Sequence, residues 1–187
     1  MTPNFQFETT PLDGLVVIRR KPRKDERGEF ERLFCVSELS DFGIDFSVKQ
    51  INRSFTKQQG TVRGLHFQRS PRAEGKLITC LAGSVLDVAV DLRRNSSTFG
   101  QWYGVELRED NNTSIYIPPG FAHGFQALTC NCELLYLHSE FYSNQLEGGV
   151  HHHDPQLAID WPLDVAQISE RDAALPFIDF SFEGIEV

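Results

Sequence analysis

The sequence predicts an all-β protein, an antiparallel sandwich or barrel with few short helices. Short runs rich in Val, Ile, Phe and Tyr recur along the 187 residues, and each is bounded by Gly, Pro, Asn or Ser. Runs of this kind at regular intervals are typical of antiparallel sandwiches and barrels. The hydrophobic fraction of 40% and the charged fraction of 24% are ordinary for a folded protein. The length favours one domain over residues 1–187.

The expected strands follow one another along the chain. The first covers residues 14–21 and the second residues 61–68, and residues 76–94 are expected to form two strands around an Ala-Gly-Ser turn. The remaining strands are expected at 98–107, 114–128 and 132–142.

Two segments carry helix signals. In residues 36–43, Ser37 is the expected N-cap and Gly43 the stop; in residues 168–176, Ser169 is the expected cap and Pro176 the end.

Charge and composition exclude several classes of function. The net charge of −8, from 18 basic and 26 acidic residues, argues against a nucleic-acid surface. The N-terminal residues lack a basic and apolar leader, and no run approaches 18 apolar residues, so we expect no secretory signal and no membrane span. The four cysteines fit neither a disulfide framework nor a zinc site and indicate reduced thiols in a cytoplasmic protein.

The strand at 61–68 carries the first candidate for chemistry, His66. Strand alternation places His66 on the face of Gly64, with Arg63 on the other face. A bulge at Gly64 would return Arg63 to the side of His66 and set a cation beside a titratable base. A structural histidine with satisfied hydrogen bonds is the alternative interpretation.

Further polar residues interrupt the apolar strands. Lys76 begins a strand, His123 lies between aromatic residues after a Pro-Pro-Gly turn, and Tyr136 lies in a leucine-rich strand, where a core tyrosine is the alternative. Asp87 and Asp91 share a face with strand valines, so they must lie near a sheet edge or meet partners.

Five of these polar residues together offer a base, a weaker acid and cations: Arg63, His66, Lys76, His123 and Tyr136. Such groups can remove a proton next to a carbonyl, stabilise the enolate and reprotonate it on the opposite face. A metal-dependent cupin would need a His-x-His pair, which "LHFQ" lacks, so we expect no metal.

Several motifs resemble the dTDP-4-dehydrorhamnose 3,5-epimerase family. They are "DERGEF", "QIN", "TVRGLHFQ", "GKL", "VLDVAVDLRRNSSTFGQW", "IPPGFAHGFQAL", "LLY", "DPQLAIDWP" and "SERDAALP", in family order over nearly the whole chain. The resemblance implies a cupin-like β-jelly roll (a double-stranded β-helix), a homodimer and no cofactor. It also implies a nucleotide-linked 4-keto-6-deoxyhexose as substrate, inverted at two carbons to give an L-rhamnose precursor.

The resemblance also assigns roles to single residues. His66 matches the general base, Asp172 the carboxylate that orients it, Lys76 the cation near the keto oxygen and Tyr136 the acid on the opposite face. The residues that match positions contacting the substrate are Arg27, Phe30, Gln50, Asn52, Arg63, His123, Phe141, Glu147 and Arg171.

Three positions depart from the family pattern: Arg32 stands where an acidic residue is usual, Ile51 replaces an aspartate and Leu137 replaces a lysine. If Arg32 reaches the base edge, it can only donate hydrogen bonds and would suit cytosine better than thymine. Three alternatives therefore stay open: epimerisation at one carbon (C3 or C5), a CDP-linked substrate, and a sugar-nucleotide-binding cupin without turnover. The glycan or natural product that receives the sugar, lipopolysaccharide among them, is also open.

Overall fold

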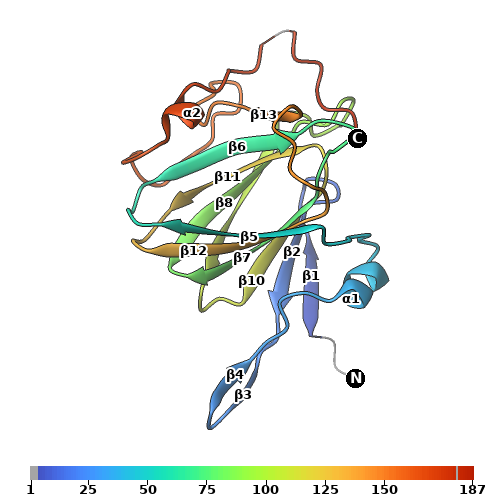
Figure 1. Cartoon of the computed structure of the whole chain (residues 1–187), viewed down its shortest axis with the longest axis vertical. Helices are drawn as coiled ribbons and strands as arrows, with labels where there is room; N and C mark the ends of the chain where they lie inside the picture. The colour runs from blue at the N-terminus through green and yellow to red at the C-terminus, as the bar shows by residue number, and fades with distance from the viewer. Residues whose placement is uncertain (1–3, 180) are drawn as a thin grey trace.

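The computed structural model describes residues 4–179 and 181–187 and contains two antiparallel β-sheets packed face to face (Figure 1). The six-stranded sheet has the order β1 (Phe5–Thr9), β2 (Val16–Arg20), β10 (Thr113–Ile117), β7 (Lys76–Ala82), β12 (Cys132–His138) and β5 (Gln50–Thr56). The five-stranded sheet has the order β13 (Glu147–Gly149), β6 (Val62–Gln68), β11 (Phe121–Ala127), β8 (Ser84–Asp91) and β9 (Trp102–Arg108).

The strand pairing identifies the fold as a cupin-like jelly roll. β5 pairs with β12, β6 with β11, β7 with β10, and β8 with β9, all antiparallel. The chain between residues 50 and 138 therefore forms one long antiparallel ribbon that is rolled so that successive pairs lie in alternate sheets. This is the double-sheet arrangement of a jelly roll, and it confirms the expected fold class. That residues 1–187 form a single domain stays a prediction.

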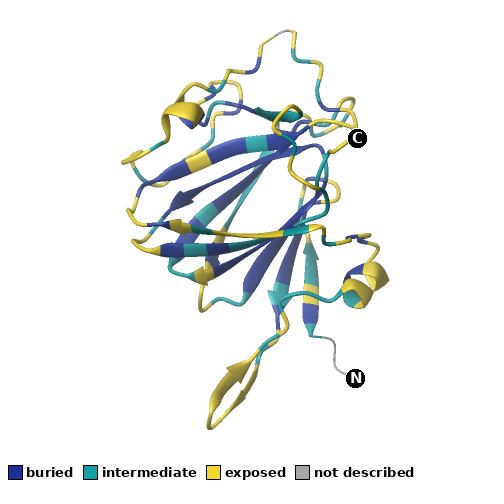
Figure 2. Cartoon of the chain, in the orientation of Figure 1, coloured by how far each residue is buried: buried dark blue, intermediate teal, exposed yellow. Residues whose placement is uncertain are grey.

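Three apolar clusters hold the layers together. Much of β8, β10 and β11 is buried, dark blue in Figure 2. The largest lies between the sheets and includes Ile78, Val85, Phe125 and Leu134. A second cluster covers the outer face of the five-stranded sheet beneath the C-terminal segment. The third covers the outer face of the six-stranded sheet, beneath α1 (Val36–Asp41) and the residues that follow it. Both sheets are thus covered on their outer faces as well as packed on each other.

Most of the expected strands are confirmed, with shifted bounds. The Ala-Gly-Ser turn lies between β7 and β8, and its Gly83 has φ +75. Residues 114–128 do not form one strand: they contain β10 and β11, which lie in different sheets. Between these strands Gly120 has φ +87, a conformation that glycine adopts without steric cost.

Both expected helices exist but are short. Ser169 caps α2 (Glu170–Ala173) as expected, because its hydroxyl accepts a hydrogen bond from the Asp172 amide at 3.0 Å. The expected cap of α1 is wrong: Cys35, not Ser37, precedes its first turn, and it makes no side-chain capping bond. Neither helix has the length or the apolar stretch that a membrane crossing requires.

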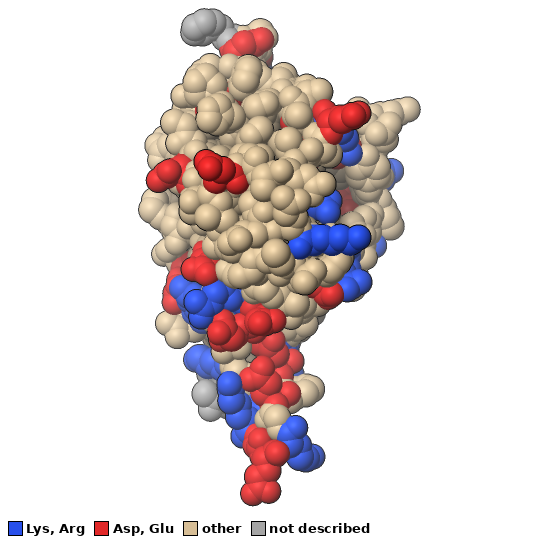
Figure 3. Space-filling model, turned by 90° about the vertical axis from the view of Figure 1, so that its left-hand side faces the viewer, with Lys and Arg blue, Asp and Glu red and all other residues tan. Residues whose placement is uncertain are grey.

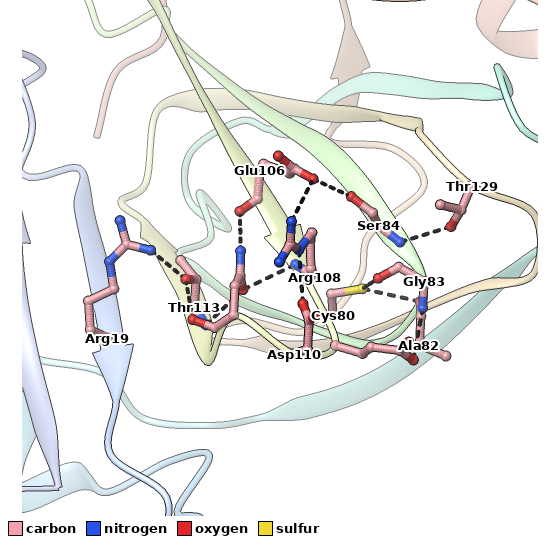
Figure 4. A network of polar contacts seen from close by, with 12 residues as sticks. Arg19, Cys80, Ala82, Gly83, Ser84, Glu106, Arg108, Asp110, Thr113 and Thr129 are labelled. Carbon is pink, nitrogen blue, oxygen red and sulfur yellow. Dashed lines mark hydrogen bonds and ion pairs between the residues drawn. The ribbon is translucent and has the colours of Figure 1, made fainter.

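The corner that follows β7 is tied to neighbouring loops by polar contacts (Figure 4). The backbone amide of Ser84 donates to the Thr129 hydroxyl at 3.0 Å, and the Ser84 hydroxyl donates to Glu106 at 2.8 Å. Cys80 and Cys132 are buried free thiols at this end, and the other two cysteines, Cys35 and Cys130, are also unpaired.

A hairpin of β3 (Arg23–Asp25) and β4 (Gly28–Phe30) projects from the six-stranded sheet (Figure 1). Its surface carries basic and acidic side chains side by side, seen on the narrow lower projection in Figure 3. Lys24 and Glu29 pair at 3.0 Å across the hairpin. At its base the buried Arg20 donates to Glu31 at 2.8 Å and so fixes the hairpin to β2.

Strands β6 and β11 approach each other closely at two glycines. A Cβ on Gly64 would lie 2.6 Å from the Gly124 Cα, and a Cβ on Gly124 would lie 2.6 Å from the Arg63 carbonyl oxygen. The register also shifts here, because His123 pairs with His66 whereas Phe125 pairs with Arg63. The extra residue in β6 is the predicted bulge, and it turns Arg63 and His66 to the same side.

Both strand aspartates meet partners. Asp91 is fully buried and accepts hydrogen bonds from Arg93 at 2.7 Å, Ser96 at 2.6 Å and Thr98 at 2.6 Å. Burial opposes the charge, but these donors outweigh it and lower the pKa of Asp91 to about 2. Asp91 thereby holds the loop that connects β8 to β9.

We expect Gly124→Ala to lower the free energy of unfolding by about 1–3 kcal/mol, because the added methyl group forces β6 and β11 apart. Urea unfolding at neutral pH measures this loss. Gly75→Ala is the matched control: its Cβ would meet nothing nearer than 3.4 Å. Equal unfolding midpoints for Gly124→Ala and Gly75→Ala would contradict the close-approach argument.

We expect Asp91→Asn to cost roughly 2 kcal/mol of stability at pH 7. The folded-state pKa of Asp91 is lowered, so its contribution is present above the unfolded value near 3.8 and is lost as the pH falls through about 2. Urea midpoints of the wild type and Asp91→Asn at pH 7, 5, 4 and 3 should therefore converge below pH 4. A gap that stays constant with pH would show that the charge of Asp91 is not the stabilising element.

Candidate active site

A cavity of about 400 Å³ opens between the two sheets, where β5 and β12 face β6 and β11. Side chains from both sheets, from α2 and from the loops before β7 and after β12 line it. They are Asn52, Arg53, Ser54, Arg63, His66, Glu74, Lys76, His123, Phe125, Tyr136, His138, Tyr142, Glu147, Ser169, Arg171 and Asp172. The lining contains four strongly basic and three acidic side chains, a composition suited to a polar, charged ligand.

On the side of the five-stranded sheet, His66 and Asp172 form a hydrogen-bonded pair. The His66 Nε2 lies 2.8 Å from Asp172 Oδ1, while the backbone amide of Gly64 donates to Asp172 Oδ2 at 3.0 Å. Burial disfavours the carboxylate, but these donors outweigh it and lower the pKa of Asp172. A charged Asp172 holds the proton of the neutral imidazole on Nε2, so the lone pair of Nδ1 is left free to act as a base.

On the side of the six-stranded sheet, Tyr136 faces the same cavity. Its hydroxyl lies 3.2 Å from the Ser54 hydroxyl of the neighbouring strand. Burial raises the pKa of the Tyr136 phenol, against the opposing effect of Ser54. The phenol therefore keeps its proton at neutral pH and can act as a proton donor.

A second histidine–carboxylate pair lies beside the first. His123 is the β11 neighbour of His66 in the strand register, and its Nε2 lies 2.9 Å from Asp87 Oδ2. Asp87 is fully buried. This pair explains why a carboxylate stands among the strand valines of β8.

Lys76 and His138 share one carboxylate, that of Glu74. The Lys76 Nζ lies 2.8 Å from Glu74 Oε1, and the His138 Nδ1 lies 2.8 Å from Glu74 Oε2. Burial opposes the charge on Glu74, yet Lys76 and His138 outweigh it and lower the pKa of Glu74 to about 2. Glu74 is therefore ionised across the physiological range.

The other basic side chains of the cavity differ in how they are neutralised. Arg171 pairs with Glu147, which also accepts a hydrogen bond from the Tyr142 hydroxyl at 2.7 Å. Arg63 donates to the Thr56 hydroxyl at 3.1 Å and to the Phe55 carbonyl at 3.2 Å. Within residues 4–179 and 181–187 no carboxylate pairs with Arg63, so its charge is available to an anionic group in the cavity.

The structure brings nine of the predicted site residues to this cavity: Asn52, Arg63, His66, Lys76, His123, Tyr136, Glu147, Arg171 and Asp172. Five others lie outside its lining. Arg27 and Phe30 lie on the projecting hairpin, and Arg32 pairs with Glu38 of α1 at 2.8 Å. Gln50 is the first residue of the edge strand β5, and the ring of Phe141 lies beneath the ammonium of Lys49, which precedes that strand. Of the other two departures from the family pattern, Ile51 is exposed and Leu137 is buried in the third apolar cluster.

Sequence reasoning did not assign to the site seven residues of the lining and the partner of His123: Arg53, Ser54, Glu74, Phe125, His138, Tyr142 and Ser169, and Asp87. Asp87 carried a signal, since a carboxylate in an apolar strand demands a partner. Glu74 and Ser54 lie in polar surroundings in the sequence and carried none.

No group of three or more His, Cys, Asp or Glu side chains that could hold a metal ion occurs in the part of the chain that the structure describes. The lining nonetheless offers the free base nitrogen of His66 on one sheet and the protonated phenol of Tyr136 on the other. The Lys76 ammonium comes from β7, which neighbours the Tyr136 strand β12 in the six-stranded sheet. Such a set can move protons on two faces of one bound molecule.

Comparisons with known proteins agree with this chemistry. The family model for dTDP-4-dehydrorhamnose 3,5-epimerase matches residues 9–179. The dTDP-4-dehydrorhamnose 3,5-epimerase of Methanothermobacter thermautotrophicus is 42% identical over 171 residues, 90% of this chain and 91% of that protein.

Two solved structures show the same similarity. The dTDP-6-deoxy-D-glucose-3,5-epimerase of Legionella pneumophila, in complex with dTDP-4-keto-L-rhamnose, is 43% identical with a TM-score of 0.88, and 92% of each chain is covered. The dTDP-4-dehydrorhamnose 3,5-epimerase of Bacillus anthracis, with TDP and pyrophosphate bound, is 37% identical with a TM-score of 0.91, and covers 93% of this chain and 99% of that chain. This chain therefore belongs to the dTDP-4-dehydrorhamnose 3,5-epimerase family.

Proposed function

We propose that this protein is an isomerase that inverts C3 and C5 of dTDP-4-dehydro-6-deoxy-D-glucose to give dTDP-4-dehydro-L-rhamnose. One observation carries the proposal: a histidine–aspartate pair and a protonated tyrosine project from opposite sheets into one cavity. Inversion of a carbon next to a ketone needs a base on one face of the sugar ring and an acid on the other. The names and ligands of the similar proteins support the same substrate.

The first step is removal of a proton from the carbon next to the C4 ketone. The Nδ1 of His66 accepts that proton, and the C–H bonding pair becomes the C=C bond of an enolate as the carbonyl π electrons move to oxygen. Asp172 stabilises the imidazolium that forms, since its carboxylate is ionised and hydrogen-bonded to Nε2. The Lys76 ammonium neutralises the negative charge that develops on the C4 oxygen.

The second step delivers a proton to the opposite face of the same carbon. The Tyr136 hydroxyl donates it, the enolate electrons return to form the C–H bond, and the C4 carbonyl is restored. His66 then loses its proton to solvent and Tyr136 regains one, so the site is ready for the second carbon. No electron is lost or gained, and the chemistry calls for no cofactor.

The remaining cavity residues are proposed to bind the substrate. Arg63, which has a free charge, and His123 lie beside His66 on the strand pair β6–β11 and would contact the reacting sugar or the diphosphate. Asn52, Glu147 and Arg171 would contact the sugar or the nucleotide. Gln50, Phe141 and Arg32 stay predictions as substrate contacts.

We propose a homodimer in the cytoplasm. Arg27 and Phe30 lie on a hairpin that does not line the cavity of their own chain. Phe30 is 75% exposed there, more than any other large apolar side chain in residues 4–179 and 181–187. As substrate contacts, these two residues would serve the cavity of a second copy, which agrees with a dimer.

Proton NMR of dTDP-4-keto-6-deoxyglucose in deuterated water tests the function. We expect deuterium at both C3 and C5 with the wild type, and a loss of at least roughly 100-fold in exchange with His66→Asn, because the base is removed. His153→Asn is the matched control, since that histidine is exposed and lies outside the cavity.

The same spectra separate the alternatives. Deuterium at only C3 or C5 would indicate a single-position epimerase. Exchange seen only with a CDP-linked ketosugar would indicate the altered nucleotide preference suggested by Arg32. Binding without exchange of either substrate would identify a non-catalytic cupin, and activity lost on adding a chelator would identify a metal-dependent enzyme.

Tyr136→Phe should separate the two faces of the reaction. Because His66 remains, deuterium should still enter recovered substrate at a rate within roughly tenfold of the wild type, whereas inverted product should fall by at least roughly 100-fold. NMR integration of the labelled substrate and product measures both rates, with Tyr103→Phe on β9 as the control. Equal losses in exchange and in inversion would mean that Tyr136 acts in proton removal instead.

A further inference from the structure

The Glu74 carboxylate lines the cavity but has no part in the proton transfers described above. Its side chain is 10% exposed and makes two hydrogen bonds, one to the Lys76 ammonium and one to the His138 imidazole, both at 2.8 Å. In residues 4–179 and 181–187, Glu74 is the only carboxylate within ion-pair distance of Lys76. Anything that fixes where this ammonium points must therefore act largely through Glu74.

Hydrogen bonds to the end of β12 hold the loop backbone next to Glu74 in place. Gly75 donates its backbone amide to the Ser139 hydroxyl at 2.7 Å, and Ser139 donates its own amide to the Gly75 carbonyl at 3.0 Å. These bonds fasten the start of β7 to the end of β12, where His138 and Lys76 are direct partners in the strand register. Glu74 therefore reaches both side chains from one fixed position.

The hydrogen bonds also fix the ring of His138. A carboxylate only accepts, so the Nδ1 of His138 must donate to Glu74, and the neutral ring then has its lone pair on Nε2. That nitrogen lies 3.3 Å from the side-chain nitrogen of Asn52, which can donate to it. The amide oxygen of Asn52, itself a cavity residue, is thereby turned away from His138.

The geometry matters because lysine is a poor positioning group by itself. Its ammonium is a point charge on a flexible four-carbon stem with three rotatable donors. One donor held by a fixed carboxylate leaves the other two directed along defined lines. The Lys76 side chain is only 7% exposed, and its charge needs a counter-charge to remain buried. Burial of the Glu74 carboxylate costs desolvation free energy as well, and the hydrogen bonds from Lys76 and His138 offset that cost.

We propose that Glu74 and His138 are positioning residues of the epimerase reaction: Glu74 aims the Lys76 ammonium at the reacting oxygen, and His138 aims the Asn52 amide at the substrate. The proposal rests on the proposed function, in which Lys76 stabilises the enolate. Glu74 acts through Lys76 and touches no reacting atom. Its loss should therefore lower kcat more than it raises KM, because the aim of the ammonium matters most when negative charge develops.

Glu74→Gln is the first test. Glutamine keeps the shape but has one acceptor oxygen for two donors, so either Lys76 or His138 loses its hydrogen bond. We expect kcat for exchange at C3 and C5 to fall at least roughly tenfold, with KM changed less than roughly threefold. Glu74→Asp, which keeps the charge, should recover part of kcat. Glu8→Gln is the matched control. It breaks an ion pair with Arg19 on the surface of β1 and β2, where the two groups are 3.1 Å apart, and kcat and KM should not change.

The Lys76→Met background decides whether Glu74 acts through the lysine. Lys76→Met alone should lower kcat by roughly 100-fold or more, as expected for loss of one group that stabilises an oxyanion. On that background the further fall caused by Glu74→Gln should be much smaller than in the wild type, because only the path through His138 and Asn52 remains. A further fall of the same size as in the wild type, or a Glu74→Gln variant with wild-type kcat, would overturn the proposal.

An activity-independent measurement separates this proposal from the proposed function. Long-range proton–nitrogen NMR of the ligand-free protein should show His138 with its proton on Nδ1, and Glu74→Gln should shift that proton toward Nε2. If the wild type exchanges no deuterium but His138 behaves in this way, the proposed function fails and the positioning network stands. A proton on Nε2 in the wild type would overturn the network whatever the activity, and so would a His138 spectrum and a kcat that are both unchanged by Glu74→Gln.

Discussion

The close approach of β6 and β11 is the constraint on which the site depends. Two glycines, Gly64 and Gly124, let the backbones meet at distances that a Cβ would forbid. The bulge at this point changes the register by one residue, and a one-residue change moves a side chain from one face of a sheet to the other. Without it Arg63 would face away from the cavity that holds His66, and His123 would lose its place beside His66.

Charge inside the cavity is controlled by short, local pairings. Asp172 is held by His66 and Gly64, Asp87 by His123, Glu74 by Lys76 and His138, and Glu147 by Arg171 and Tyr142. Asp172, Glu74 and Glu147 thus meet donors that offset their desolvation, as buried ions require, whereas the second oxygen of Asp87 is buried without a hydrogen-bond partner in the described residues. The exception among the cations is Arg63, whose hydrogen bonds go to a hydroxyl and a carbonyl. An anionic substrate would find its unpaired charge there.

The jelly-roll topology explains why the proposed base and acid lie on different sheets. Because β5–β12 and β6–β11 are successive pairs of one ribbon that lie in different sheets, their residues face each other across one cavity. His66 and its partner strand supply one wall, Tyr136 and Ser54 the other, and α2 brings Asp172 to the His66 wall from the far end of the chain. A two-faced proton transfer is the chemistry that such opposed walls serve best.

The sequence by itself determined the strand-rich class, most strand positions, the family and nine residues that line the cavity. It could do so because strand alternation, turn residues and the family motifs are local patterns. The edge strand β5 was missed because its apolar Ile51 and Phe55 point outward while the polar Asn52 and Ser54 face the cavity, the reverse of the usual pattern. Only the tertiary structure decided the pairings between distant residues that the family motifs did not indicate. His138 reaches Glu74 over 64 positions and His123 reaches Asp87 over 36, and no local pattern encodes a contact across such a separation.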